Sequence, residues 1–74
     1  MEQKIKYILS IVFEVLEEDI DGNFSNETVA GWDSLKQMQL AEAIEEEFNI
    51  RLTDDNIVNL RSYNIILTIV KEHC

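Results

Sequence analysis

The 74-residue sequence contains no proline, two glycines and one cysteine. The lack of proline and the scarcity of glycine argue against a fold of many tight turns and favour helices joined by loops. A single cysteine forms no internal disulfide, which fits a reducing compartment. The apolar N-terminal segment lacks a small-residue cleavage site and the length of a membrane span. We therefore expect a cytoplasmic protein without a membrane span.

Basic residues are also scarce. Six lysines and arginines stand against fifteen acidic residues, which gives a formal net charge of -9. Nucleic-acid binding begins with phosphate neutralisation by Lys and Arg, so this charge argues against a nucleic-acid partner. An acidic surface is complementary to proteins with basic patches, and it also keeps a small domain soluble. We expect a monomer with protein partners of that kind.

Groupings of residues that are typical of active sites are missing as well. The only histidine, His73, adjoins Cys74 and lies far along the chain from Ser34. These residues predict neither a four-ligand zinc site nor a serine activated by histidine. The acidic stretch from Asp19 lacks the glycine and the glutamate that a calcium-binding EF-hand loop requires at its sixth and twelfth positions. We therefore expect no metal site and no enzymatic activity.

The apolar residues that are present recur at steps of three and four, which is typical of helical faces. They predict a first helix whose apolar face begins at Ile5 and which frays near Glu18, a second from Ser34 to Phe48, a short third capped by Thr53, and a fourth capped by Ser62. A chain of this size can build one thin core. The predicted fold is all-α, a small four-helix bundle with one short third helix, and residues 1–74 form a single domain.

The stretch "GWDSLKQM", residues 31–38, has two interpretations. In the first, Ser34 caps the second helix and forms a capping box with Gln37, so its hydroxyl has only a structural role. In the second, Asp33 is the cap and Ser34 is the first helical residue. Its hydroxyl then points outward at a helix N-terminus, which favours a phosphate. Leu35 and Met38 would add an apolar patch with an acidic rim, typical of a docking surface.

The combination of "GWDSL", a helix ending in "EEEF", a short helix led by "DD" and a closing amphipathic helix resembles the acyl carrier proteins over essentially the whole chain. The resemblance implies that Ser34 carries 4′-phosphopantetheine, transferred from coenzyme A by a phosphopantetheinyl transferase. It implies that Asp33 assists this transfer, commonly by helping to position magnesium. The chain would hold acyl groups as thioesters for enzymes of lipid, polyketide or related biosynthesis.

The resemblance also implies a surface for partner recognition. Acyl- or aminoacyl-loading enzymes and acyl-transferring enzymes would bind it through basic docking patches of their own. Its residues would come from the second helix and, in one case, from the third: Leu35, Met38, Glu42 and Ile57.

Three residues depart from the pattern of fatty-acid carriers. Lys36 and Gln39 stand where those carriers usually have acids, and Trp32 stands where they often have a small residue. We expect weaker use by ordinary fatty-acid synthase enzymes. Two alternatives stay open from the sequence: an aminoacyl or peptidyl carrier, such as a D-alanyl carrier, or an unmodified helical protein-interaction domain in which Ser34 is only a cap.

Overall fold

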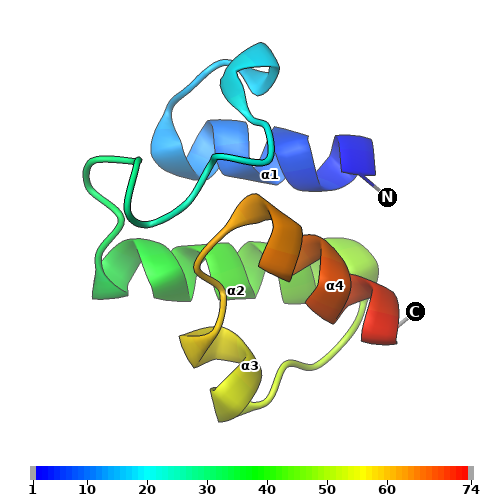
Figure 1. The fold of residues 1–74 in the computed structure, drawn as a ribbon. Coiled ribbons are helices and arrows are strands. Elements are labelled where there is room, and N and C mark those ends of the chain that lie inside the picture. The colour runs from blue at the N-terminus through cyan, green and yellow to red at the C-terminus, as the bar shows by residue number, and fades with distance from the viewer. Residues whose placement is uncertain (1, 74) are drawn as a thin grey trace.

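The computed structural model describes residues 2–73, so Met1 and Cys74 lie outside the described residues. Its elements are α1 (Glu2–Phe13), the short 3-10 helix η1 (Glu17–Asp19), α2 (Ser34–Phe48), α3 (Asp54–Val58) and α4 (Tyr63–His73). Figure 1 shows α1 and α2 side by side and antiparallel, with the short α3 next to α2. The predicted all-α fold with a short third helix is confirmed. The predicted bounds of the second helix are also confirmed.

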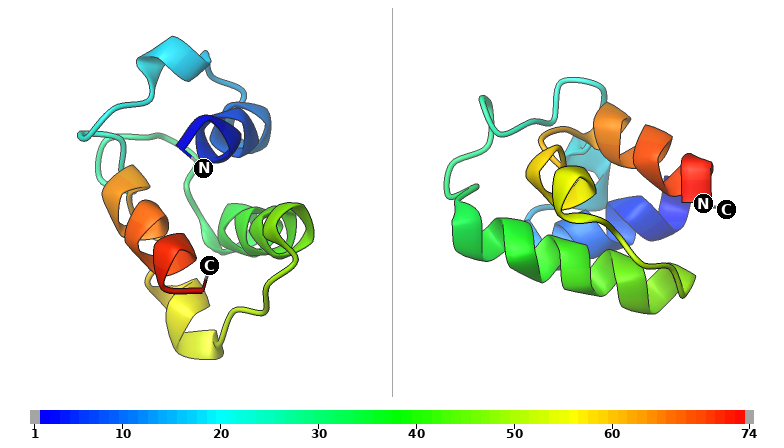
Figure 2. Two further views of the ribbon diagram at one scale, coloured as in Figure 1. Left: turned by 90° about the vertical axis from the view of Figure 1, so that its right-hand side faces the viewer. Right: turned by 90° about the horizontal axis from the view of Figure 1, so that it is seen from below.

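One core lies between α1, α2 and α4, as the end-on view in Figure 2 shows. The apolar faces of these helices supply most of it, at steps of three and four residues. Its buried helical residues include Ile5, Ile8, Leu9, Leu40, Ala41, Ile44, Ile66, Ile69 and Val70. Segments between the helices add Ile20, Phe24, Leu52 and Leu60. Burial on this one shared core fixes how the three long helices pack.

The N-cap residues of α3 and α4, Thr53 and Ser62, were predicted from the sequence and are confirmed. Thr53 and Asn56 form a capping box: the Asn56 N–H donates to Thr53 Oγ1 over 3.0 Å, and the Thr53 N–H donates to Asn56 Oδ1 over 3.1 Å. At the start of α4, the Ile65 N–H donates to Ser62 Oγ over 3.1 Å. These bonds satisfy N–H groups that have no partner inside their helices.

The end of α1 differs from the prediction. The helix stops at Phe13 and does not extend towards Glu18. Glu14 follows with a φ of 56°, a left-handed conformation that ends the helix. From α2, the Lys36 ammonium donates to the Val12 carbonyl over 2.9 Å. This tertiary bond places a positive charge at the negative end of the α1 dipole and satisfies one of its last carbonyls.

The long loop between η1 and α2 is held against the start of α4. The Tyr63 N–H donates to the Phe24 carbonyl over 2.9 Å, and the Asn26 N–H donates to the Arg61 carbonyl over 2.8 Å. The Phe24 side chain is also buried in the core. The loop therefore has a defined path over the bundle, and it leads directly into α2.

Candidate functional site

The first turn of α2 decides between the two interpretations of Ser34. Asp33 is the N-cap, with an extended backbone, and its Oδ1 accepts a hydrogen bond from the Lys36 N–H over 2.9 Å. Ser34 is the first residue of the helix and is exposed. Within residues 2–73 its hydroxyl has no hydrogen-bond partner. The structure therefore supports the second interpretation, in which the serine hydroxyl is available for chemistry.

Gln37 does not form the capping box that the first interpretation predicts. Its Oε1 accepts from the indole Nε1 of Trp32 over 2.8 Å. Its Nε2 donates to the carbonyls of Ile57 and Leu60, over 2.6 and 2.7 Å. Carbonyls at the end of a helix lack helical partners, so they are good acceptors for this amide. Gln37 thus connects the first turn of α2 to the end of α3.

Trp32 fixes the chain just before the cap. Its half-buried ring lies 4.6 Å from the Phe13 ring and 5.8 Å from the Phe24 ring, measured between centroids. The two phenylalanine rings are 5.8 Å apart and meet edge to face. Aromatic pairs in such geometries stabilise by about 0.5–1.5 kcal/mol beyond area burial. The cluster joins α1, the long loop and the start of α2, and so positions Asp33 and Ser34.

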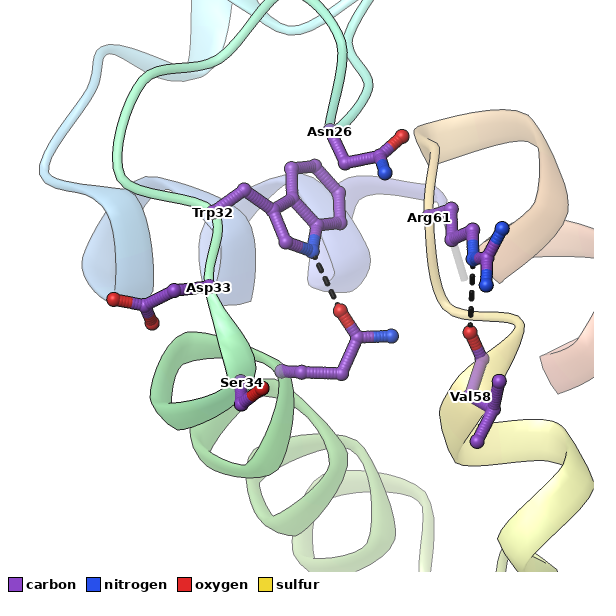
Figure 3. A pocket seen from close by; sticks show the side chains of 7 residues that line it. Asn26, Trp32, Asp33, Ser34, Val58 and Arg61 are labelled. Atoms are coloured by element: carbon purple, nitrogen blue, oxygen red, sulfur yellow. Dashed lines mark hydrogen bonds between the residues drawn. The ribbon is translucent and has the colours of Figure 1, made fainter.

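An open depression of about 500 Å³ lies beside Ser34, and Figure 3 shows it from close by. Ser34 is on one side, and Val58 and Arg61 are on the other. The full lining is Asn26, Trp32, Asp33, Ser34, Gln37, Val58 and Arg61. It combines polar groups with an indole face and an aliphatic side chain. A flexible polar chain attached to Ser34 would find room and hydrogen-bonding groups here.

Sequence reasoning missed three of these lining residues: Asn26, Val58 and Arg61. They belong to the loop and to the α3–α4 junction, and the fold brings them to Ser34 from distant parts of the chain. No local motif marks them. The exposed arginine next to a short helix was the one available signal, because a cation is scarce in this acidic sequence.

The residues expected to recognise partners differ in exposure. Leu35 is 65% exposed and Met38 is 49% exposed, so both offer apolar surface at the start of α2. Glu42 is exposed farther along the same helix. Ile57 is half-buried and packs against the core, whereas its neighbour Val58 is 57% exposed. The apolar surface that α3 offers is therefore mainly that of Val58.

Comparison with known proteins agrees with this geometry. A family model described as "Phosphopantetheine attachment site" matches residues 3–68. A protein of Buchnera aphidicola subsp. Baizongia pistaciae (strain Bp) named "Acyl carrier protein" is 36% identical over 73 residues, which cover 99% of this chain and 94% of that protein. The chain belongs to the acyl carrier protein family. A second "Acyl carrier protein", from Buchnera aphidicola subsp. Schizaphis graminum (strain Sg), is 37% identical over 62 residues, 84% of this chain and 78% of that protein.

Membership makes this chain a carrier protein and not an enzyme, with 4′-phosphopantetheine as its cofactor. The described residues fit that cofactor. They offer an exposed alcohol without an internal partner, at a helix N-terminus that favours a phosphate, beside an open depression.

Two findings concern other kinds of site. Within residues 2–73, no group of three or more His, Cys, Asp or Glu side chains is placed to hold a metal ion. Across the same part of this carrier, no helix combines the length and the apolar character needed to cross a membrane.

Proposed function

We propose that this carrier, acting as one domain in the cytoplasm, holds acyl groups as thioesters on a 4′-phosphopantetheine arm attached to Ser34. The observation that supports the proposal best is that Asp33, and not Ser34, caps α2. Asp33 caps the helix, so the Ser34 hydroxyl is exposed and has no hydrogen-bond partner in the described chain. A serine that served only as a cap would use its oxygen for the helix.

In the attachment step, the Ser34 oxygen forms a bond to the phosphorus next to the pantetheine of coenzyme A. The pyrophosphate bond breaks, adenosine 3′,5′-bisphosphate leaves, and the serine proton passes to a base of the transferase. The product phosphodiester is an anion at the N-terminus of a 15-residue helix, where the backbone N–H groups and the dipole stabilise it. Asp33, at the adjacent position, assists the transferase by helping to position magnesium, as is common in this family.

The exposed side of α2 forms the partner surface in this proposal. Leu35 and Met38 lie three residues apart on one helical face and provide the apolar centre. Glu42 and neighbouring acids provide a charged rim. The partners are a phosphopantetheinyl transferase and the enzymes that load and transfer acyl groups in lipid, polyketide or related biosynthesis. Basic patches on those enzymes would speed association with a chain of net charge -9.

The test is intact mass before and after incubation with coenzyme A and a promiscuous phosphopantetheinyl transferase. The wild type should gain one phosphopantetheine, and Ser34→Ala should gain none. Because the Ser34 hydroxyl makes no hydrogen bond in residues 2–73, Ser34→Ala should change stability by no more than about 0.5 kcal/mol. Ser62→Ala is the matched control, since Ser62 also begins a helix but uses its oxygen as the cap.

Ser62→Ala should lose about 1 kcal/mol of stability and still accept the arm. A wild-type chain that stays unmodified, under conditions that load a control carrier, would favour the unmodified interaction domain. For a chain that does accept the arm, the mass of cargo released from protein purified from its own cells would separate acyl from aminoacyl carriers.

A further inference from the structure

Arg61 has hydrogen-bonding capacity that the fold does not use. Its Nε donates to the Val58 carbonyl over 3.1 Å, at the end of α3. Arginine often satisfies the last carbonyls of a helix in this way. That contact uses one of the five N–H donors of the guanidinium. Within residues 2–73, the two terminal nitrogens of Arg61 have neither a hydrogen-bond nor an ion-pair partner.

The unused N–H donors of Arg61 belong to a side chain that lines the depression beside Ser34. Figure 3 shows the guanidinium across the depression from Ser34. The bond to Val58 holds it there, and the bond from the Asn26 N–H to the Arg61 carbonyl fixes its backbone. The depression has one other charged lining residue, Asp33, whose carboxylate already accepts a hydrogen bond as the cap of α2. Arg61 is therefore the one cation among the residues that line this space.

A cation is unusual at this position in so acidic a molecule. The net charge of -9 repels an anion from most of the surface, so an anionic group would need a local positive partner. A neutral hydrocarbon would need none. The planar guanidinium fork matches a carboxylate or a phosphate through two parallel hydrogen bonds. Trp32 and Val58 add an aromatic face and an aliphatic side chain that suit the methylene groups of a short acyl chain.

We propose that Arg61 forms a subsite for the terminal carboxylate of an acyl cargo, so that this carrier favours short dicarboxylic acyl groups. The inference rests on the proposed attachment of the arm to Ser34. Two oxyanions of a loaded carrier have the required chemistry: the phosphodiester at Ser34 and a carboxylate at the far end of the cargo. The position of Arg61 across the depression from Ser34 favours the carboxylate.

The experiment compares three loaded forms of the protein, made with the transferase from coenzyme A, butyryl-coenzyme A and succinyl-coenzyme A. Butyryl and succinyl groups have four carbons each and differ in the terminal carboxylate. Intact mass confirms each loading. The terminal carboxylate of the succinyl group carries ¹³C, and its pKa is measured by NMR titration in the wild type and in variants. The Arg61 Nε–H resonance is followed in all three forms.

The expected result is a succinyl carboxylate pKa lower by about one unit in the wild type than in Arg61→Gln, because an adjacent arginine stabilises the charged form. Arg61→Lys keeps the charge without the fork and should give an intermediate value. Arg51→Gln is the matched control. It removes the same charge from an exposed arginine beyond the other end of α2, which is about 22 Å long and exceeds the screening length at 0.1 M salt.

Three outcomes would count against the subsite. Equal carboxylate pKa values in the wild type and Arg61→Gln overturn the subsite and leave the proposed function intact. So does an Arg61 resonance that moves equally in the unacylated, butyryl and succinyl forms, since the phosphodiester would then be its anion. A chain that accepts no arm overturns the proposed function, and the subsite with it. A lower pKa that Arg61→Gln abolishes and Arg51→Gln retains supports it.

Discussion

The indole nitrogen of Trp32 donates to the side-chain oxygen of Gln37 over 2.8 Å, while the nitrogen of the same amide donates to two carbonyls at the end of α3. One side chain therefore joins the loop before Ser34, the first turn of α2 and the end of α3. The amide uses its oxygen and both N–H groups in partly buried bonds. The shape of the depression beside Ser34 depends on this connection.

Gln37→Ala should lower the free energy of unfolding by about 1–3 kcal/mol, because it leaves the Trp32 N–H and the Leu60 carbonyl without this partner, while the Ile57 carbonyl keeps the Leu60 N–H. Amide exchange in residues 54–60 should accelerate, since α3 loses its tie to α2. Urea denaturation and hydrogen exchange measure these effects. Gln39→Ala is the control, because Gln39 is exposed on the same helix and should change stability by less than about 0.5 kcal/mol. Equal effects of the two substitutions would show that the connection contributes nothing.

Asp33 has two roles that substitution can separate. Asparagine caps helices as well as aspartate does, so Asp33→Asn should keep stability within about 0.5 kcal/mol of the wild type. Asp33→Ala should lose about 1 kcal/mol. If the carboxylate helps to position magnesium during attachment, both variants should load phosphopantetheine at least about tenfold more slowly. Thermal denaturation and a time course of intact mass test this, and rapid loading of Asp33→Asn would remove the carboxylate from the reaction.

Lys36→Met should destabilise the protein by about 0.5–1.5 kcal/mol, because the Val12 carbonyl loses a charged donor at the end of α1. Lys4→Met is the control. Lys4 pairs with Glu47 at 3.8 Å between exposed side chains, an arrangement of little value for stability. Chemical denaturation of both variants at one ionic strength gives the comparison. A larger loss for Lys4→Met would contradict the assignment of Lys36 as a support of α1.

The Tyr63 phenol provides a prediction for alkaline pH. Burial raises its pKa above the ordinary value of 10.0, and repulsion from the Glu2 carboxylate raises it further. The unfolded chain therefore releases this proton at a lower pH than the folded chain. The contribution to stability is fully present below about pH 10 and is lost as the pH rises through the higher folded pKa.

Tyr63→Phe should remove that alkaline loss. At neutral pH its stability should equal or exceed that of the wild type, because the buried Tyr63 hydroxyl has no hydrogen-bond partner within residues 2–73. Urea unfolding below and above pH 10 measures both effects. Tyr7→Phe removes a phenol that is 57% exposed and serves as the control. Parallel pH curves for the wild type and Tyr63→Phe would refute the prediction.

The charge of -9 predicts that added sodium chloride raises the melting temperature. Self-repulsion destabilises the compact state, and salt screens it. Within residues 2–73 the structure has one ion pair, between exposed side chains, so screening has few attractions to weaken. Thermal scans at fixed pH over a range of salt concentrations test this, and a melting temperature that falls with salt would oppose it.

Local sequence signals, namely helix caps and apolar periodicity, were enough to predict part of the fold. The span of α2 and the caps Thr53 and Ser62 follow from residues within a few positions of each helix start. The end of α1 did not follow, because the helix ends in a left-handed turn at Glu14, with the Val15 N–H donating to the Ser10 carbonyl, and no glycine or asparagine marks that turn in the sequence. Periodicity alone extended the helix past this turn.

The candidate site was predictable to a similar extent. Ser34 and Asp33 stand in a short motif, and a helix start limits their possible roles. Gln37 was misassigned because its partners, the carbonyls of Ile57 in α3 and of Leu60 just beyond it, lie 20 and 23 positions away, whereas a capping box needs only neighbours. Arg61 was not predicted at all, since only the packing of the α3–α4 junction beside α2 brings it to the depression.

The pairing of the long loop with the start of α4 has a mechanical consequence. Both bonds, from Tyr63 to Phe24 and from Asn26 to Arg61, join backbone atoms, so they do not depend on which side chains occupy those positions. Main-chain hydrogen bonds thus anchor the loop that precedes Ser34 to the start of α4. A partner enzyme therefore meets a serine whose preceding loop is anchored to the last helix, and a flexible arm on that serine would supply reach that the loop does not need to provide.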